Sequence, residues 1–396
     1  MSDVEPLDIK MNRKGFGLRA EVKEEIQNVY SSPIIEAIKA SGYTKKFGRF
    51  TIHLAKEFGF CYGVDRAVEL AYETRRNFPQ GKRIYLTTEI IHNPTVNANL
   101  SSMGIGFLSG PYQSAAIESV SKDDVVIVPA FGTTVGQLVQ LHDIGCTLVD
   151  TICGSVVNVW KRVEKYAQEG FASIIHGKYK HEETQATSSR VLQFPNGHYL
   201  IVLDMHEARY ACDYILNGGS RDEFLKKFAN AISPGFDPDR HLERVGLANQ
   251  TTMLSSESLE ISKMFEEALT QKHGEGFVKG HFRSFDTICS ATQERQDAIM
   301  QLRDLRPNVF LVVGGYNSSN TAHLQEIAMR DAPSFHIDRA DCLLSESQIR
   351  HQPFGTKAEI INADWLPKGD VSIGITAGAS TPNKVMGDVL ERLVGF

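Results

Sequence analysis

The sequence has none of the features that mark a membrane-spanning or secreted protein. No uninterrupted apolar run reaches the roughly 18 to 20 residues that cross a bilayer, and the longest ones, such as residues 124–129, are typical of buried strands. Residues 1–15 carry acidic side chains and no apolar block, unlike a secretory signal or a transit peptide. We therefore expect a cytoplasmic protein without a membrane partner, or a plastid stromal one if the chain is the mature form of a plant protein.

Cysteine is also scarce, and no Cys-x-x-Cys pair occurs. Six cysteines in 396 residues are too few for a disulfide framework. Zinc sites usually draw on closely spaced ligand pairs, so the absence of such pairs argues against a structural zinc site. Free thiols or another kind of metal centre are the alternatives that remain.

A strong excess of one charge is missing as well. The formal net charge is −6, with 23% charged and 42% hydrophobic residues, which is typical of an ordinary globular protein. This balance excludes a disordered chain and a nucleic-acid binder that relies on a basic field. The length predicts two or three domains, and we expect a small-molecule partner.

What the sequence does contain is a repeated tetrapeptide. Asp150-Thr-Ile-Cys153 returns as Asp286-Thr-Ile-Cys289, and each copy precedes apolar residues at helical spacing. The same apolar stripe follows Cys61, although the residues before it differ. Each of these three cysteines is therefore predicted to begin a helix, and we predict that the three thiols meet at one centre.

From residue 49 onward, short β-rich runs alternate with amphipathic helices, a pattern typical of α/β proteins with parallel sheets. The runs fall into three rows, each of which begins at one of these cysteines and contains two strands that end in small or polar residues. Ligands bind beyond the carboxyl ends of parallel strands, so these ends are expected to line a site. The predicted runs are residues 84–92, 125–134, 172–176, 245–252, 309–315 and 371–380.

The three rows predict three α/β lobes related by pseudo-threefold symmetry, each with a small parallel sheet. Residues 1–48 are polar and lysine-rich, and we interpret them as an N-terminal extension with a short helix around residues 21–30. Residues 204–244 are interpreted as a surface insertion in the second lobe. The predicted boundaries are 49–153 for the first lobe, 154–288 for the second, 289–381 for the third, and a tail of 382–396 that packs against the first lobe.

Scattered cysteines suit an iron–sulfur cluster better than zinc, because such clusters accept thiolates from distant positions. Helix N-termini favour thiolate and a net negative cluster. Three thiolates on a four-iron cluster would leave one iron open to a substrate oxygen. The alternative is that the cysteines are small core residues, which is our interpretation of Cys146, Cys212 and Cys342.

The polar strand ends also admit two interpretations. His92 follows a buried strand and is either a ligand or a hydrogen-bonded loop histidine. His181 and Glu183 either form a solvated charged loop, or Glu183 holds a proton in a closed cavity and donates it. Two interpretations, phosphate binding and helix capping, apply to the neutral donors of residues 250–252, 317–320 and 378–380.

Taken together and in order, these motifs resemble the 4-hydroxy-3-methylbut-2-enyl diphosphate reductase (LytB/IspH) family, in its cyanobacterial and plant branch. The match runs from about Phe58 to the C-terminus. It rests on Phe60-Cys61-Tyr-Gly-Val-Asp-Arg-Ala-Val, His92-Asn, Asp150-Thr-Ile-Cys153, His181-x-Glu183, Gln250-Thr-Thr, Cys289-x-Ala-Thr-x-x-Arg-Gln, Asn317-Ser-Ser-Asn and Thr376-Ala-Gly-Ala-Ser380.

The resemblance implies a trefoil of three lobes around a central iron–sulfur cluster, and the last step of the non-mevalonate (MEP) isoprenoid pathway. In that step an allylic diphosphate loses its hydroxyl group and gives isopentenyl and dimethylallyl diphosphate. The implied [4Fe-4S] ligands are Cys61, Cys153 and Cys289. The implied catalytic residues are Glu183, Thr251 and His181. The implied diphosphate ligands are His92, His181, Ser318, Ser319, Asn320 and Ser380, with Thr251 at the hydroxyl end of the substrate.

One position departs from the pattern of many bacterial members. They carry a histidine that binds diphosphate where this chain has Phe131, and Thr133, Thr134 or water are the candidates to replace it. The branch also implies ferredoxin as the electron donor, which no motif shows. The alternatives to the reductase are a quinolinate synthase-like [4Fe-4S] enzyme and a non-catalytic α/β binding protein with incidental buried thiols.

Overall fold

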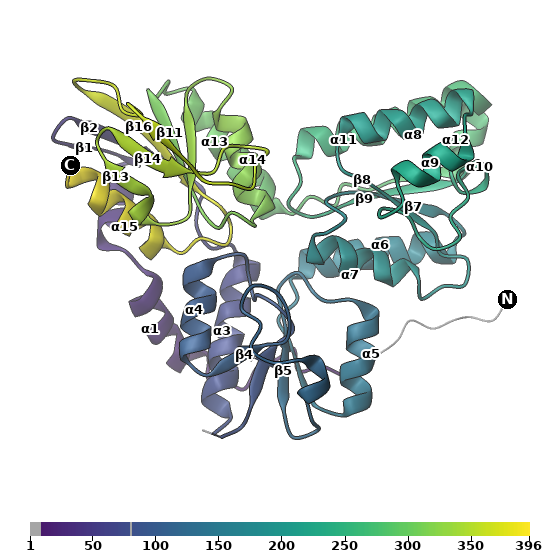
Figure 1. Cartoon of the computed structure of the whole chain (residues 1–396), viewed down its shortest axis with the longest axis horizontal. Coiled ribbons are helices and arrows are strands. Elements are labelled where there is room, and N and C mark those ends of the chain that lie inside the picture. The colour runs from purple at the N-terminus through teal and green to yellow at the C-terminus, as the bar shows by residue number, and fades with distance from the viewer. Residues whose placement is uncertain (1–8, 80) are drawn as a thin grey trace. The chain divides into compact units, whose positions relative to one another are not determined.

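The computed structural model describes residues 9–79 and 81–396, which form two compact units. Unit 1 comprises residues 9–11, 120–122 and 131–289, and unit 2 comprises the other described residues. Residues 1–8, which belong to the predicted N-terminal extension, lie outside the described residues. Both units contain buried parallel strands flanked by helices, so the predicted α/β class is confirmed (Figure 1). No helix in the described part of the chain has the length and apolar composition that crossing a bilayer requires.

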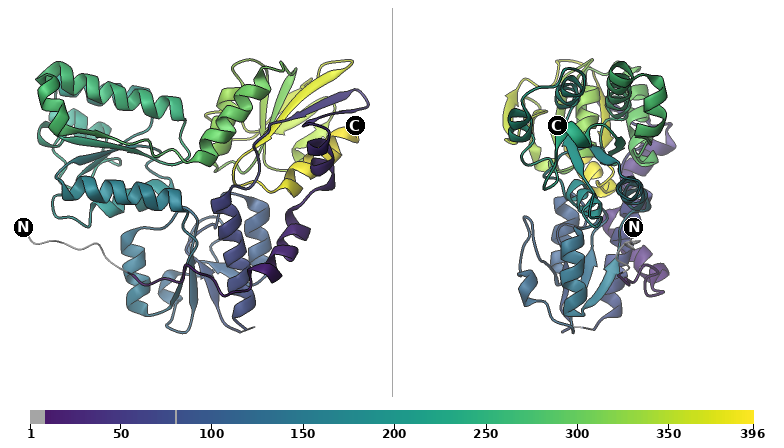
Figure 2. Two further views of the ribbon diagram at one scale, coloured as in Figure 1. Left: turned by 180° about the vertical axis from the view of Figure 1, so that it is seen from behind. Right: turned by 90° about the vertical axis from the view of Figure 1, so that its right-hand side faces the viewer.

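Unit 1 is built on one parallel sheet, in the order β10-β9-β7-β8. Every residue of β7 and β9 is buried, as expected for strands covered on both faces. Helices α6 and α7 cover one face, and α8 and α11 cover the other (Figure 1, Figure 2). The strands of unit 1 are β6 (Thr147–Asp150), β7 (Ala172–His176), β8 (Tyr199–Val202), β9 (Val245–Asn249) and β10 (Phe282–Ser284). Its helices are α5 (Val135–Ile144), α6 (Gly154–Gln168), α7 (Glu182–Val191), α8 (Met205–Asn217), α9 (Arg221–Lys227), α10 (Pro238–His241), α11 (Ser255–His273) and α12 (Glu275–His281).

Much of the predicted surface insertion belongs to the core of unit 1. Helix α8 follows β8 as a crossover helix and buries Ala208 and Cys212 in the cluster that also contains residues of α11. Phe224 of α9 and Phe228 just after it are 0% and 1% exposed. The interpretation of residues 204–244 as a surface insertion was therefore wrong for these helices, because apolar side chains between the glycine- and proline-containing turns are buried in the core of unit 1.

The larger sheet of unit 2 has the order β1-β2-β16-β11-β12, and only the β1–β2 hairpin is antiparallel. Helices α2 and α15 pack on one face of this sheet, and α13 and α14 lie on the other (Figure 1, Figure 2). Its strands are β1 (Thr44–Phe47), β2 (Phe50–Leu54), β11 (Val309–Val313), β12 (Ser334–Ile337) and β16 (Val371–Ala377). Its helices are α2 (Pro33–Ala40), α13 (Ser290–Arg303), α14 (Ser319–Ala328) and α15 (Asn383–Val394).

Two smaller groups of strands complete unit 2. In the first, β3 pairs in parallel with β4 and β5. In the second, β13, β14 and β15 form an antiparallel sheet. The sequence did not predict this second sheet, because its strands have only three or four residues. The remaining elements are α1 (Arg19–Tyr30), α3 (Tyr62–Asn77), β3 (Ile84–Leu86), α4 (Pro94–Ser102), β4 (Ile105–Phe107), η1 (Ile117–Ser119), β5 (Val125–Val128), η2 (Ala340–Cys342), β13 (Leu343–Ser345), β14 (Gln348–His351) and β15 (Ile360–Ala363).

The described part of the polar N-terminal segment is anchored in unit 2. The helix predicted around residues 21–30 is present as α1, and its Tyr30 is buried with the hydroxyl 3.3 Å from that of Tyr72. Ile35 and Ile38 of α2 are fully buried in the same core cluster as residues of α15. A few apolar residues at helical spacing therefore attach a segment whose overall composition is polar.

All six predicted strand runs contain a strand, in the predicted order: β3, β5, β7, β9, β11 and β16. The boundaries of the three lobes stay a prediction. Strand β2, which we had placed in the first lobe, pairs with β16 of the third, and α15 packs against the sheet that both strands share.

Candidate functional site

The repeated tetrapeptide forms the same local structure twice. In the first copy the backbone N–H of Ile152 donates to Asp150 Oδ1 at 2.8 Å, and in the second the N–H of Ile288 donates to Asp286 Oδ1 at 3.0 Å. An aspartate that accepts from the residue two positions later fixes a tight turn. The repeat therefore orients the backbone that leads into each cysteine.

The six cysteines fall into two groups by environment. The partly exposed ones are Cys61, Cys153 and Cys289, and the buried ones are Cys146, Cys212 and Cys342. Each partly exposed cysteine directly precedes a helix, respectively α3, α6 and α13. Exposed amide N–H groups at a helix N-terminus favour thiolate, so the chemistry of these three residues fits ligation of an iron–sulfur cluster.

The buried cysteines have the opposite character. Burial raises the pKa of the Cys212 thiol to about 12, and burial also raises the pKa of Cys342. A buried thiol that resists deprotonation is a poor metal ligand. The structure thus supports the interpretation of these residues as small core side chains.

The closest pair of predicted site residues in unit 1 is Glu183 and Thr251. The Glu183 carboxylate accepts the backbone N–H of Thr251 at 2.6 Å on Oε1 and the Thr251 hydroxyl at 3.0 Å on Oε2. Both side chains are buried, at 2% and 5% exposed. The solvated-loop interpretation of Glu183 was therefore wrong, because the first turn of α7 carries this carboxylate onto the end of the neighbouring strand β9.

Cys289 joins this pair through the backbone. Its N–H donates to the carbonyl of Thr251 at 3.3 Å. Just before it, the hydroxyl of Thr287 accepts the N–H of Asn249 at 2.8 Å. Unit 1 thus brings one predicted cluster ligand next to the predicted proton donor.

Gln250, for which the sequence left phosphate binding and helix capping open, uses its side-chain oxygen to support the strand ends. Its side-chain oxygen accepts the N–H of Lys178 at 3.2 Å and the hydroxyl of Thr184 at 3.1 Å, and its N–H donates to the His176 carbonyl at 2.8 Å. These bonds tie the ends of β7 and β9 together. A long polar side chain directly after a fully apolar strand was the signal in the sequence.

His181 caps helix α7. Its Nδ1 accepts the backbone N–H of Glu183 at 3.1 Å. A ring nitrogen that accepts carries no proton, so the neutral imidazole has its proton on Nε2. The hydrogen-bonding edge that remains is a donor.

The two threonines that were candidates to replace a missing histidine take part in the start of α5. Thr134 is the N-cap and accepts the N–H of Gln137 at 3.3 Å, and the Thr133 hydroxyl donates to the Gln137 side chain. Their hydroxyl groups are thus engaged within the helix terminus. Phe131 lies beside His181 instead.

In unit 2, His92 is held by a buried acidic residue. Its Nδ1 lies 3.1 Å from Oε2 of Glu89, whose other oxygen accepts from the Asn97 amide at 3.2 Å. A carboxylate can only accept, so Nδ1 of His92 carries a proton. Glu89 is not among the predicted site residues, although an acidic residue inside an apolar run is a signal that the sequence contains.

The loop after β11 packs directly on the backbone of His92. A Cβ atom at Gly315 would lie 2.3 Å from the His92 carbonyl oxygen, so only glycine permits this approach. Ser318 then caps α14 by accepting the N–H of Thr321 at 3.2 Å, which confirms the capping interpretation for this residue. Ser319 is 2% exposed in the first turn of the same helix.

Asn320 connects this loop to the end of β16. Its Oδ1 accepts the N–H of Ala379 at 3.0 Å, and the Ala379 carbonyl accepts the N–H of Cys61 at 3.2 Å. Ser380, which follows, is half-buried. Unit 2 therefore brings together Cys61, His92, residues 318–320 and Ser380.

Several buried donors in this region have no hydrogen-bond partner among the described residues. They include Nδ2 of Asn320, Nδ2 of Asn93 and Oγ1 of Thr321. Leaving such a group unpaired costs about 1–3 kcal/mol, so a ligand or water that accepts from it would be stabilised here. These donors suit an anion with several oxygens.

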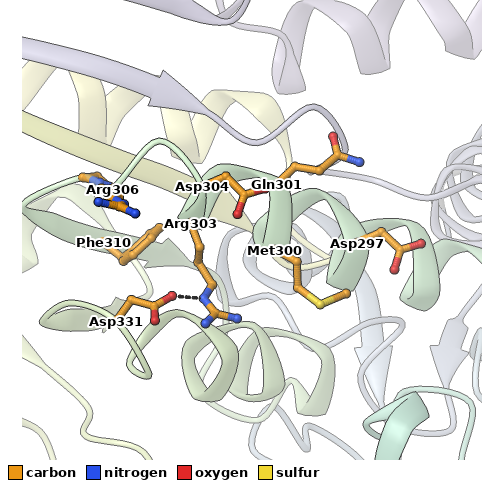
Figure 3. A pocket seen from close by; sticks show the side chains of 9 residues that line it. Asp297, Met300, Gln301, Arg303, Asp304, Arg306, Phe310 and Asp331 are labelled. Carbon is orange, nitrogen blue, oxygen red and sulfur yellow. Dashed lines mark hydrogen bonds and ion pairs between the residues drawn. The ribbon is translucent and has the colours of Figure 1, made fainter.

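A surface hollow of about 910 Å³ lies elsewhere in unit 2 (Figure 3). It is lined by the C-terminal half of α13 and the start of β11, and it contains the ion pair between Arg303 and Asp331. Ser318 follows the opposite end of β11. The polar strand ends are the better candidate for the functional site, because the acidic and basic side chains that line the hollow do not converge on one point.

The family model described as LytB protein matches residues 52–394. The chain belongs to the LytB family. Among its relatives, the 4-hydroxy-3-methylbut-2-enyl diphosphate reductase of Microcystis aeruginosa is 51% identical over 386 residues, covering 97% of this chain and 94% of the relative. The enzyme of the same name from Cyanothece is 52% identical over 384 residues, covering 96% and 93%. The resemblance predicted from the motifs, including its cyanobacterial branch, is thus confirmed.

Solved structures agree with the LytB assignment. The structure of (E)-4-hydroxy-3-methyl-but-2-enyl diphosphate reductase, described as the terminal enzyme of the non-mevalonate pathway, has a TM-score of 0.52 and 26% identity, covering 87% of this LytB chain and 99% of the other. The reductase of Plasmodium falciparum has a TM-score of 0.60 with 21% identity over 86% of each chain, which shows a shared fold. Membership of the LytB family favours the reductase over a quinolinate synthase.

Proposed function

We propose that this chain is a 4-hydroxy-3-methylbut-2-enyl diphosphate reductase, an oxidoreductase of the last step of the MEP pathway. Two electrons and two protons remove the allylic hydroxyl of (E)-4-hydroxy-3-methylbut-2-enyl diphosphate as water, and the products are isopentenyl and dimethylallyl diphosphate. The observation that carries this proposal is the buried Glu183–Thr251 pair, hydrogen-bonded to Cys289, in a chain of the LytB family.

The residues proposed to hold the cofactor are the three partly exposed cysteines, Cys61, Cys153 and Cys289. A [4Fe-4S] cluster held by these residues would pass on two electrons from an external donor, one at a time, and would offer an iron without a protein ligand as a Lewis acid. The protein's own contribution is the helix N-terminus beside each thiolate, which offsets its negative charge. Ferredoxin is the proposed electron donor.

Glu183 is proposed to deliver a proton to the leaving hydroxyl. Its carboxylate is buried, and burial disfavours the charged form, while the two hydrogen bonds from Thr251 favour it. When Glu183 takes up a proton, the Thr251 hydroxyl can accept that proton and pass its own to the substrate oxygen. The hydroxyl at 3.0 Å from Glu183 is thus placed for a relay as well as for orientation.

The diphosphate is proposed to be bound mainly by neutral donors. In unit 2 these are the residues of the 318–320 loop and Ser380, and in unit 1 the donor is Nε2 of His181. His92, whose Nδ1 proton is directed to Glu89, is proposed to join them as a donor from Nε2 when its ring is an imidazolium. Several converging donors can bind an anion without lysine, and helix N-termini such as that of α14 add a favourable dipole. The unpaired donors of Asn320 and Thr321 support this role.

Anaerobic turnover of the allylic diphosphate, with iron and sulfide counted in the same sample, tests the proposal. We expect about four irons per active chain and formation of both diphosphate products with a chemical reductant. A colourless, iron-free protein that does not convert the substrate would support the alternative of a non-catalytic binding protein.

A further inference from the structure

The loop that follows β5 places an aromatic ring beside His181. The rings of Phe131 and His181 have their centroids 6.1 Å apart and cross at 72°, an edge-to-face arrangement, and Phe131 is 8% exposed. We propose that Phe131 is a positioning residue, which holds the imidazole of His181 so that its Nε2–H is presented to a bound diphosphate. This inference rests on the proposed function, because the proposed substrate supplies the diphosphate to which His181 would donate.

The hydrogen bond from Glu183 and the ring contact from Phe131 restrain different motions of the His181 imidazole. The N–H of Glu183 determines which nitrogen of His181 accepts, and therefore sets the tautomer. This hydrogen bond lies in the plane of the ring and acts on one of its edges. An edge-to-face contact from Phe131 restricts tilting of the ring, and such contacts contribute about 0.5–1.5 kcal/mol.

The backbone next to Phe131 packs against Trp160 of α6. The next residue, Gly132, has φ of +83°, and a Cβ atom there would lie 2.3 Å from the Trp160 ring. The Arg190 guanidinium of α7 lies over the Trp160 ring, 4.1 Å from its centroid. The backbone after Phe131 therefore rests on a buried indole and cannot easily shift.

The same loop is also tied to the helix that His181 caps. The N–H of Val135 donates to the Ser189 hydroxyl of α7 at 3.0 Å. Phe131 and His181 are thus joined through α7 as well as by their rings. Because the hydroxyl groups of Thr133 and Thr134 are used at the start of α5, we infer that this loop contributes shape to the site through Phe131.

A double-mutant cycle tests whether Phe131 acts through His181. Binding of inorganic diphosphate to the cluster-loaded protein is measured by anaerobic calorimetry for wild type, Phe131→Leu, His181→Ala and the double variant. We expect Phe131→Leu to weaken binding about 3- to 10-fold and Phe131→Tyr to restore it to within twofold. On a His181→Ala background, Phe131→Leu should change affinity by less than twofold, because the group that it positions is gone.

Phe194→Leu is the matched control. Phe194 is 6% exposed and packs between α6 and α7 away from His181, so its truncation should lower the melting temperature and leave diphosphate affinity within twofold. Unchanged binding in Phe131→Leu, or losses that multiply in the double variant, would overturn the inference. A wild-type protein that converts no substrate and binds no diphosphate would instead refute the proposed function, and the inference with it.

Discussion

His181 in unit 1 and His92 in unit 2 follow corresponding strands, yet the protein holds them in opposite ways. His181 accepts a backbone N–H on Nδ1 and keeps its proton on Nε2. His92 directs its Nδ1 proton to the Glu89 carboxylate. His92 therefore presents a donor at Nε2 only when it is an imidazolium, whereas neutral His181 presents one already.

The acidic residues of the two units differ in the same way. The Glu183 carboxylate accepts two hydrogen bonds from Thr251. Glu89 is bonded to a histidine and to Asn97, which is the arrangement of an orienting group. On this contrast we propose that Glu183 serves proton transfer and that Glu89 supports diphosphate binding through His92.

The largest effect is expected from the cysteines, because both units are proposed to need them for the cofactor. Cys153→Ser should remove most of the cluster absorbance and lower turnover more than 100-fold. Cys212→Ser, a matched change at a buried thiol of the same unit, should retain both. Absorbance spectra and iron counts after anaerobic purification check this, and equal losses in the two variants would refute the division of the cysteines.

Glu183→Gln should give the next largest effect. The amide cannot donate an acidic proton, so we expect kcat to fall about 100- to 1000-fold while the cluster spectrum stays unchanged. Steady-state rates with a chemical reductant measure this. Near-normal kcat would show that the proton arrives by another route.

Glu89→Gln should have a smaller effect and a different kind of effect. A neutral amide accepts the Nδ1 proton of His92 more weakly than a carboxylate does, so the ring is held less firmly and we expect KM to rise about 5- to 10-fold with kcat within threefold. Glu118→Gln, at an exposed position of unit 2, is the control and should change neither. A fall in kcat without a rise in KM would contradict the assignment of Glu89.

The smallest effect is a pH dependence of stability in unit 2. His336 is buried, its ring lies 2.9 Å from the Gly314 carbonyl through Nε2, and burial lowers its pKa to about 4. The unfolded chain binds this proton at a pKa near 6.5, so stability should fall as the pH drops from about 6.5 to 4 and then level off. Chemical unfolding at several pH values gives the slope of the unfolding free energy against pH. Between pH 6.5 and 4 this slope should be shallower for His336→Phe than for wild type. Parallel slopes would contradict the lowered pKa.

The sequence predicted the features that depend on local pattern. Apolar runs located the strands, and the repeated tetrapeptide correctly set Cys153 and Cys289 apart from buried cysteines such as Cys212. The family resemblance, and not the local pattern, implied related roles for Glu183 and Thr251, and the structure shows that the two residues are hydrogen-bonded.

The remaining features depend on contacts between distant residues. The tautomer of His92 is determined by Glu89, whose side chain comes from the same loop but whose orientation depends on Asn97. The ring contact of Phe131 depends on how α7 packs, which no spacing reveals. In residues 204–244, turn residues separate the apolar side chains of α8 and α9. The sequence pattern therefore did not predict that these side chains are buried.

The most direct test of the contrast between the units is the equilibrium binding of inorganic diphosphate to Glu89→Gln and Glu183→Gln, measured side by side on the cluster-loaded protein. Both variants replace a carboxylate by an amide of similar size, so they differ only in which of the two glutamates is changed. We predict that Glu89→Gln weakens binding about 10-fold and that Glu183→Gln leaves it within twofold. Stronger weakening by Glu183→Gln than by Glu89→Gln would contradict the division of roles between the two units.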